Sequence, residues 1–504
     1  MNKSIENRAR PSLVIANAAR QSMIPKFAMK TLIVKSAALA TSTFLATSTF
    51  LAACSLMPAY ERPNAPVAPQ WPASASVSAS TSSSTAQNTA TLAWQDYFAD
   101  AGLRELIDTA LTNNRDLRVA VLNIEQARAQ LGIRRADQFP TLAAAVAGSR
   151  TATGTGSFSN VYTAGLTVTA YEVDFFGRVA SLKEQALAQY LATTEASQTE
   201  QISLIATVVQ SWLSLLADEE LLAVSRQTLA SREESLTLVE LKLRHGAASE
   251  LDQRLAQTLL ESARVTLAQQ MRQRALDENA LVLLLGQPLS TTFQAQLSSQ
   301  QFTQLQFAEL PAGLPSDLLA SRPDIRQAEQ QLIASNANIG AARAAFFPRI
   351  SLTAGAGSAS NELSGLLKDG SWGFTLAPQL VLPLFDAGRN QANLASAQAA
   401  RDIAVAQYEK AIQSAFREVA DALAGRDTLA RQLHAAQAQL DAEAARSRLT
   451  KLRYDNGAAS QLDWLDAQRS LFATRQALVQ TRLAYLQNQV SLYKALGGGA
   501  SPRP

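Results

Sequence analysis

The sequence predicts a mainly α-helical protein with a small transmembrane β part, built from one unit that occurs twice. The segment from His245 to Asp252 returns in nearly the same form from Asn456 to Asp463, about 210 residues later. A long proline-free stretch of helical character precedes each copy of this segment. Short segments that alternate apolar and small polar residues precede each long stretch. Because the period is far above the roughly 20–50 residues of solenoid repeats, we interpret the chain as a duplicated domain.

Each unit has the same order: a helix, two short strands, a very long helix, a sharp turn and a second helix. In the first unit, apolar residues recur at helical spacing from Leu103 to Gln138, which predicts the first helix. Pro140 ends this helix, since proline disfavours helical backbone at the residue before it.

Two strand-like segments follow, and in the second of them the residue types alternate. The apolar set is Ala164, Leu166, Val168 and Ala170, and the small or polar set is Thr163, Gly165, Thr167 and Thr169. The pattern is typical of a membrane barrel strand beside a water-filled lumen, although one such segment is equally compatible with a surface hairpin. The second unit repeats it, from Ile350 to Ala356 and from Phe374 to Leu382.

The long helices are predicted from Gly177 to Arg244 and from Gly388 to Asp455. At 1.5 Å per residue each would be roughly 100 Å long. The returning helices, from Glu250 to Leu285 and from Gln461 to Leu496, would each be roughly 54 Å, as would the helix that begins at Leu103. Two short helices placed end to end therefore match one long helix, and each unit can build a layer two helices wide.

Four strands cannot form a barrel alone. Lipid tolerates only helices or closed barrels, and single-chain barrels have at least about eight strands. After the N-terminal leader we find no apolar run of about 20 residues that would predict a transmembrane helix. We therefore expect an oligomeric barrel. Three copies would supply a 12-stranded β-barrel and, below it, an α-helical barrel.

The N-terminus predicts a lipoprotein signal peptide over residues 1–53. A basic segment that begins at Met29, an apolar run and the sequence Leu51-Ala-Ala-Cys54 follow one another, and the last four residues resemble the bacterial lipobox. Cys54 would then carry an N-acyl and an S-diacylglycerol lipid; a secretory signal that only happens to precede a cysteine is the alternative. Ser55 stands where aspartate would signal inner-membrane retention, which favours the outer membrane. The sequence leaves two candidate start codons, Met1 and Met29.

The predicted organisation divides the rest of the chain into five parts. These are a lipid-anchored tether and equatorial segment (54–100), the first channel repeat (101–287), an inter-repeat equatorial linker (288–315), the second channel repeat (316–497) and a C-terminal tail (498–504). Removal of the basic leader changes the formal net charge from +3 to −3, so basicity gives no reason to expect nucleic acid as a partner.

The inventory of reactive residues argues against an enzyme. Cys54 is the only cysteine, and His245 and His434 are the only histidines, so neither a metal site nor a cofactor other than the lipid is expected. A coiled-coil surface scaffold could use the long helices, but it would leave the amphipathic strands unexplained.

Several longer motifs resemble one known family, the TolC-like outer-membrane efflux proteins, and within it the OprM/NodT lipoprotein branch. The motifs are Cys54–Pro63, Leu314–Arg326, Leu382–Arg389, Asp466–Leu471 and Tyr493–Gly498. The resemblance covers the chain from Cys54 to its end. It implies a homotrimeric channel-tunnel in the cell outer membrane, with a long periplasmic extension, that passively conducts drugs or other small toxic compounds and so confers antibiotic resistance. It also implies two partners, a periplasmic adaptor and an inner-membrane pump of the RND type. Metal-ion efflux and protein secretion remain alternatives, because these systems share the outer component.

The resemblance also implies roles for the residues around the two turns. The adaptor-contact tips are Gly246, Ala247, Ser249, Gly457, Ala458 and Ser460, and the channel gate comprises Leu462, Asp466, Asp463, Asp252 and Tyr454. Leu462 and Asp466 lie one turn apart on one face of a helix, so threefold symmetry would form an apolar and an acidic ring. Where TolC has an arginine two residues after the turn glycine, this chain has Ala459, which favours a ring gate over a salt-bridge latch. Trp464 is expected to serve packing.

Overall fold

The computed structural model describes residues 55–71, 92–154, 156–291, 293, 302–308, 310 and 322–498. The leader, Cys54, residues 72–91 of the predicted tether, most of the predicted linker and all but the first residue of the predicted tail lie outside these ranges. The chain divides into two units between Ser55 and Leu56, and the following description concerns the unit that begins at Leu56.

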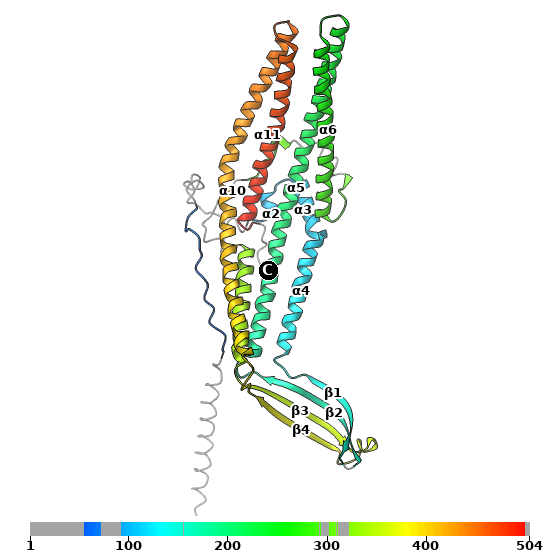
Figure 1. Ribbon diagram of the computed structural model, residues 1–504, viewed down its shortest axis with the longest axis vertical. Coiled ribbons are helices and arrows are strands. Elements are labelled where there is room, and N and C mark those ends of the chain that lie inside the picture. The colour runs from blue at the N-terminus through cyan, green and yellow to red at the C-terminus, as the bar shows by residue number, and fades with distance from the viewer. Residues whose placement is uncertain are drawn as a thin grey trace, which may run out of the picture. The chain divides into compact units, whose positions relative to one another are not determined.

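The duplicated order of elements is confirmed (Figure 1). The first half contains α2 (Trp94–Tyr97), α3 (Ala101–Asn113), α4 (Arg115–Ala136), β1 (Leu142–Thr153), β2 (Ser157–Val173), α5 (Arg178–Arg244) and α6 (Glu250–Leu285). The second half contains the short 3₁₀ helix η3 (Phe302–Gln304), α9 (Pro323–Ala344), β3 (Arg349–Ser360), the 3₁₀ turn η4 (Leu363–Gly365), β4 (Trp372–Val381), α10 (Arg389–Asp455) and α11 (Gln461–Ala495). The two long helices, α5 and α10, have 67 residues each, in accord with the predicted ranges.

The prediction of one helix from Leu103 to Gln138 is wrong, because Asn114 interrupts it. Asn114 has extended backbone angles (φ −61°, ψ 133°), and its side chain accepts a hydrogen bond from the Leu117 amide, which starts α4. Its Nδ2 atom donates to the Leu284 carbonyl oxygen at 2.9 Å. This contact joins the end of α3 to the end of α6, so that α4 and α6 both pack along α5.

The four strands form one antiparallel sheet in the order β1-β2-β3-β4. The register places the apolar positions of neighbouring strands opposite one another, as Leu166 pairs with Ala356 and Ala356 with Phe374. Gly165 pairs with Gly357, and a Cβ atom at Gly165 would collide with the Ala356 carbonyl oxygen. The two strands therefore approach as closely as they do only because glycine occupies this position.

Both layers of the chain end in an open edge. Within the sheet, β1 and β4 each have one neighbour. Among the helices, α4 and α6 contact α5 at one side, whereas α10 contacts α9 and α11 at the other. In the chain, β1 follows α4 and β4 precedes α10. The open edge of the sheet at β1 therefore corresponds to the open edge of the helices at α4, and the edge at β4 corresponds to the edge at α10.

An ion-pair cluster joins the sheet to α5. Both oxygens of Glu172, near the end of β2, accept hydrogen bonds from Arg178 at 2.7 and 2.6 Å. Arg349, at the start of β3, also contacts Glu172 at 2.7 Å. One largely buried carboxylate thus holds a long helix and two strands at the point where they meet.

The core lies midway along the long helices, where α2 and α3 pack against them. Its largest fully buried side chains include Trp212, Tyr408, Tyr493 and Phe98. Tyr97 stacks on Tyr493 with ring centroids 4.5 Å apart. Contrary to expectation, α5 contains a stretch long and apolar enough to be a candidate membrane span, but 61% of that stretch is buried inside the protein. Its apolar residues are accounted for by the core.

Residues 56–62 of the predicted tether are docked along α9 and are not a free linker. Tyr60 Oη donates to Glu329 at 3.0 Å, and Arg62 Nε donates to the same carboxylate at 2.7 Å. Further towards the N-terminus, Arg343 Nη1 donates to the Leu56 carbonyl oxygen at 3.2 Å. We call residues 56–62 the strap. It runs against the direction of α9, so its first residues lie beside the end of α9 that leads into the sheet.

Candidate functional site: the hairpin tips

The helical hairpins α5–α6 and α10–α11 end in turns of the same geometry, at the end of the molecule opposite to the sheet (Figure 1). Gly246 and Gly457 both have a φ of 70°. The next amide in each turn donates back into its helix: Ala247 to the Lys242 carbonyl oxygen at 2.8 Å, and Ala458 to that of Arg453 at 2.7 Å. A Cβ atom would have open space at either glycine, so the backbone angle is what requires glycine.

Asp252 and Asp463, predicted as gate residues, close the turns of their own hairpins. In each case the serine three residues earlier donates its amide (2.9 Å) and its hydroxyl (2.7 Å) to the aspartate, and the aspartate amide donates back to the hydroxyl. These bonds, to Ser249 and Ser460, form a capping box at the start of α6 and of α11. The same bonds lower the pKa of both aspartates below the usual value. The two acids therefore shape the tips.

Leu462 and Asp466 lie on the first turns of α11, as predicted, and they differ in their surroundings. The Leu462 side chain is 61% exposed. Asp466 accepts hydrogen bonds from Arg446 of α10 at 2.9 Å and from Arg469 of α11 at 2.6 Å. Two guanidinium groups thus compensate the charge of Asp466 within each chain.

Tyr454 of α10 and Trp464 of α11 form an aromatic stack inside the second hairpin. Their rings are 5.0 Å apart at an angle of 18°, and Tyr454 is buried. Lys242, from the other hairpin, donates to Tyr454 Oη at 2.8 Å and lies 4.2 Å from the ring centroid. The contact is both a hydrogen bond and a cation–π interaction. It is a direct tie between α5 and α10 close to the turns.

The comparisons with known proteins agree with this geometry. The model of the outer membrane efflux protein family matches residues 106–287 and 314–498. The chain belongs to the outer membrane efflux protein family.

Individual relatives are similar over most of their length. The solvent efflux pump outer membrane protein SrpC of Pseudomonas putida is 46% identical over 88% of this chain and 94% of its own length. Outer membrane protein OprJ of Pseudomonas aeruginosa is 45% identical over 87% of this chain and 92% of its own. The open-state crystal structure of the MtrE outer membrane channel of Neisseria gonorrhoeae matches with a TM-score of 0.80 and 40% identity, over 89% of this chain and 99% of that one. This efflux protein is accordingly an outer-membrane channel protein, and its relatives are channels rather than enzymes.

Lys242, Arg446 and Arg469 were missed in the sequence, and Trp464 was assigned to packing alone. Comparison of the two repeats contains the signal that could have found the aromatic pair. Tyr454 and Trp464 occupy positions that hold Leu243 and Gln253 in the first hairpin. The two repeats differ at two positions that face each other across the turn, which indicates a feature specific to the second hairpin.

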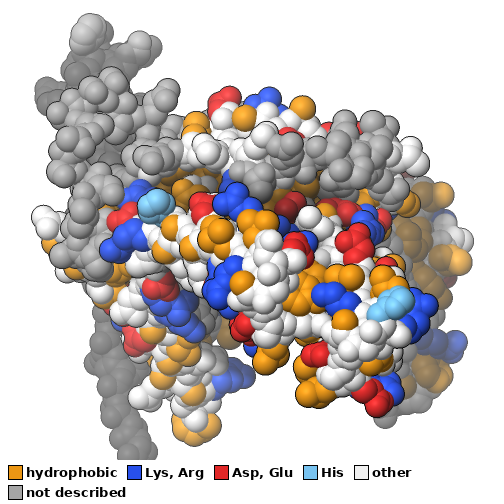
Figure 2. All heavy atoms as spheres, turned by 90° about the horizontal axis from the view of Figure 1, so that it is seen from above, with side chains coloured by type: hydrophobic (Ala, Val, Ile, Leu, Met, Phe, Trp, Pro, Cys, Tyr) orange, Lys and Arg blue, Asp and Glu red, His pale blue; other side chains and the backbone are white. Residues whose placement is uncertain are grey.

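The surface at the tips carries mixed charge. Figure 2 looks at this end along the helices and shows basic side chains beside acidic ones, with apolar side chains between them. A surface of this kind suits a contact with another protein better than capture of one strongly charged ligand.

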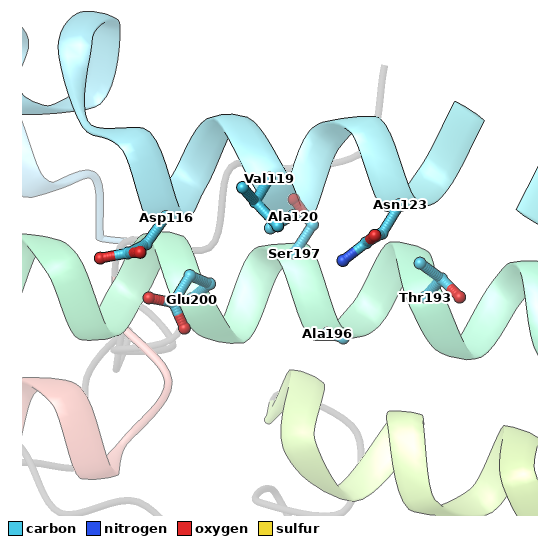
Figure 3. Close-up of a pocket in the computed structure, with 8 residues that line it drawn as sticks. All are labelled: Asp116, Val119, Ala120, Asn123, Thr193, Ala196, Ser197 and Glu200. Carbon is cyan, nitrogen blue, oxygen red and sulfur yellow. The ribbon is translucent and has the colours of Figure 1, made fainter. Parts of the chain in front are cut away.

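A hollow of about 420 Å³ lies between α4 and α5 of the efflux protein (Figure 3). Asp116 of α4 and Glu200 of α5 stand at one end of it, and small side chains such as Ala120 and Ser197 line the rest. Over the ranges that the structure describes, no group of three or more potential metal-binding side chains was found. The hollow therefore combines two carboxylates at one end with a mainly small and apolar lining.

Proposed function

We propose that this efflux protein is the homotrimeric channel-tunnel of a tripartite efflux system and conducts small hydrophobic compounds such as solvents and antibiotics. The observation that carries the proposal is the matched open edges of the sheet and of the helical layer. Three copies joined β4 to β1 and α10 to α4 and α6 would close both layers at once. The substrate class rests on relatives named as solvent and antibiotic efflux pump proteins.

Light scattering of the detergent-solubilised protein tests the trimer. The expected mass is near three times the chain mass of 53.9 kDa, less the leader and plus the lipid. A stable folded monomer would contradict the closure argument.

The partners in this proposal are a periplasmic adaptor and an inner-membrane pump of the RND type. We assign adaptor contact to six small tip residues, which are all exposed: Gly246, Ala247, Ser249, Gly457, Ala458 and Ser460. Since each turn is closed by its own capping box, the tips hold their shape without a partner and offer a preformed surface. Replacing Ala247 and Ala458 with arginine should weaken co-purification with the adaptor, while trimers persist.

We assign the constriction to Leu462 and Asp466, held in place by the Lys242–Tyr454 tie. Replacing both Leu462 and Asp466 with alanine removes the apolar knob and frees two arginines. We expect larger single-channel conductance in planar bilayers and weaker cation selectivity. Leu251→Ala is the matched control, because Leu251 is the repeat equivalent of Leu462 and is 68% exposed. If the double variant conducts like the parent, the constriction lies elsewhere, and Tyr454, Asp463 and Asp252 are tested next.

Lipid anchoring at Cys54 completes the proposal. Leu56, two residues later, lies beside Arg343, almost at the end of α9 that leads into strand β3. Two residues span at most about 7 Å, so a lipid on Cys54 would be attached within that distance of Leu56. Cys54→Ser should abolish labelling of the protein with a fatty-acid probe in cells. Persistent labelling of the variant would contradict the assignment.

A further inference from the structure

One face of α5 changes character along its length. From Ile202 to Leu222 almost all of its buried residues are apolar. Beyond Leu222 the same helix buries three polar side chains, Ser225, Arg232 and Ser235, which are 1%, 4% and 2% exposed. Their spacing of seven and three residues puts them on one face.

That face meets α11 of the other hairpin. Arg232 Nη1 donates to Gln468 Oε1 of α11 at 2.7 Å. The contact is neighboured by a second one, in which Arg475 Nη1 of α11 donates to Gln227 Oε1 at 2.9 Å. We call this face of α5, from Ser225 to Lys242, and the part of α11 that it meets, the upper seam.

Arg232 is a buried cation with a neutral partner. Among the described residues its only recorded hydrogen bond is the one to Gln468, and no carboxylate lies within ion-pair distance. Burial, and then the like charge of Arg469, lower the pKa of the Arg232 guanidinium below its usual value. Arg469 itself is bound to Asp466. A buried charge with no compensating charge destabilises the packed arrangement. Contact of the guanidinium with water would remove this free-energy penalty.

The two serines add to this effect. Among the residues that the structure describes, neither Ser225 Oγ nor Ser235 Oγ has a hydrogen-bond partner. A buried hydroxyl without a partner also costs free energy, and exposure to water satisfies it. Three successive groups on one face therefore favour hydration over burial.

We propose that the upper seam is a weak, hydratable interface that separates when the channel opens, and that Arg232 is the positioning residue that promotes its separation. The apolar core below Leu222 stays closed and serves as the fixed end. The inference rests on the gate proposed above. It adds the identity of the interface that separates and of the side chain that favours the separated state.

Thiol labelling tests the seam without reference to conduction. Cysteine is placed at Ser235 in the seam and, as a matched control, at Ala206 in the core; both positions are 2% exposed. Purified trimers are reacted with a maleimide, and the protein without an introduced cysteine is the blank for Cys54. We expect Ser235→Cys to react at a measurable rate and Ala206→Cys to remain protected.

Two substitutions, one at Arg232 and one at its partner Gln468, then test the buried charge; each lowers the net charge of the seam by one. Arg232→Met removes the buried charge at similar volume, and Gln468→Glu supplies it with a counter-charge. Each should slow labelling at position 235 by about tenfold or more, because each removes the penalty of the closed seam. Arg272→Met, which removes an exposed arginine from α6, should leave the rate unchanged.

Two results would overturn the proposal. One is equal protection of the cysteines at 235 and 206. The other is labelling at position 235 that is as fast or faster in Arg232→Met, since the arginine would then hold the seam together. Failure of the constriction is separate from both outcomes, because it is read from the conductance of the Leu462 and Asp466 double variant.

Discussion

The stability of this protein should depend on pH through one buried carboxyl pair, and Asp218→Asn tests that dependence. Asp218 of α5 is 6% exposed, and its Oδ2 atom has no hydrogen-bond donor. Burial and the adjacent carboxyl group of Asp277, on α6, raise the pKa of Asp218 from 3.8 to about 7. Arg274 opposes the rise, but its guanidinium is also engaged by Glu219 and Glu278.

The sign and size of the effect follow from that shift. In the folded protein the pair keeps a proton that Asp218 of the unfolded chain releases near pH 3.8. The free energy of unfolding is therefore largest below pH 3.8. It falls as the pH rises and stops falling once the pH is above about 7. One pKa unit corresponds to about 1.4 kcal/mol, so the loss between pH 4 and pH 8 is up to about 4 kcal/mol per chain. Asparagine carries no charge at any of these pH values. The variant should therefore lack this loss.

Thermal unfolding of detergent-solubilised trimers, followed by circular dichroism at pH 5, 6, 7 and 8, measures the difference. The unfolding temperature of Asp218→Asn minus that of the parent should rise with pH and level off near pH 8. All other ionisable groups are the same in the two proteins, so their contributions cancel in the difference. Asp277→Asn should give the same trend. A difference that is constant across the pH range would refute the reasoning.

Three further predictions concern the sheet, the strap and their junctions. Glu172→Gln should lower the unfolding temperature by several degrees in thermal scans, because both arginines at the joint of sheet and helix lose their counter-charge. Gly165→Ala should reduce the amount of trimer recovered from outer membranes, whereas Gly154→Ala, which has open space, should not. Glu329→Gln weakens the strap and should increase proteolysis of the segment at Arg62 without loss of trimer; unchanged cleavage would show that other contacts hold it.

The long elements could be predicted from sequence because their signals are local. Both long helices, α5 and α10, were predicted to within one residue. The signals were the absence of proline within each helix and a glycine shortly before and after it. The range of α6 was predicted as it stands. The break at Asn114 was missed because the apolar spacing continues through it, and its cause includes a contact with Leu284 that lies 170 residues away.

The turns and caps at the tips could be predicted from the sequence, whereas the partners of the charged residues there could not. Asp252 and Asp463 carry a local signal, a serine three residues earlier, that indicates a helix cap. Asp466 has no such signal, since one of its arginine partners, Arg446, lies 20 residues away on another helix. The strap was out of reach for the same reason, because Tyr60 and Glu329 are 269 residues apart.

The capping boxes at the tips have a mechanical consequence. Since each turn closes on itself, the α10–α11 hairpin can move as a stiff lever whose pivot is the core. Leu423 is among the last fully buried residues of α10, and from there to Asp455 the helix extends about 48 Å at 1.5 Å per residue. Each degree of rotation at the pivot then displaces the tip by about 0.8 Å. A tilt of a few degrees, too small to disturb side-chain packing at the pivot, would move Leu462 by more than the width of a water molecule.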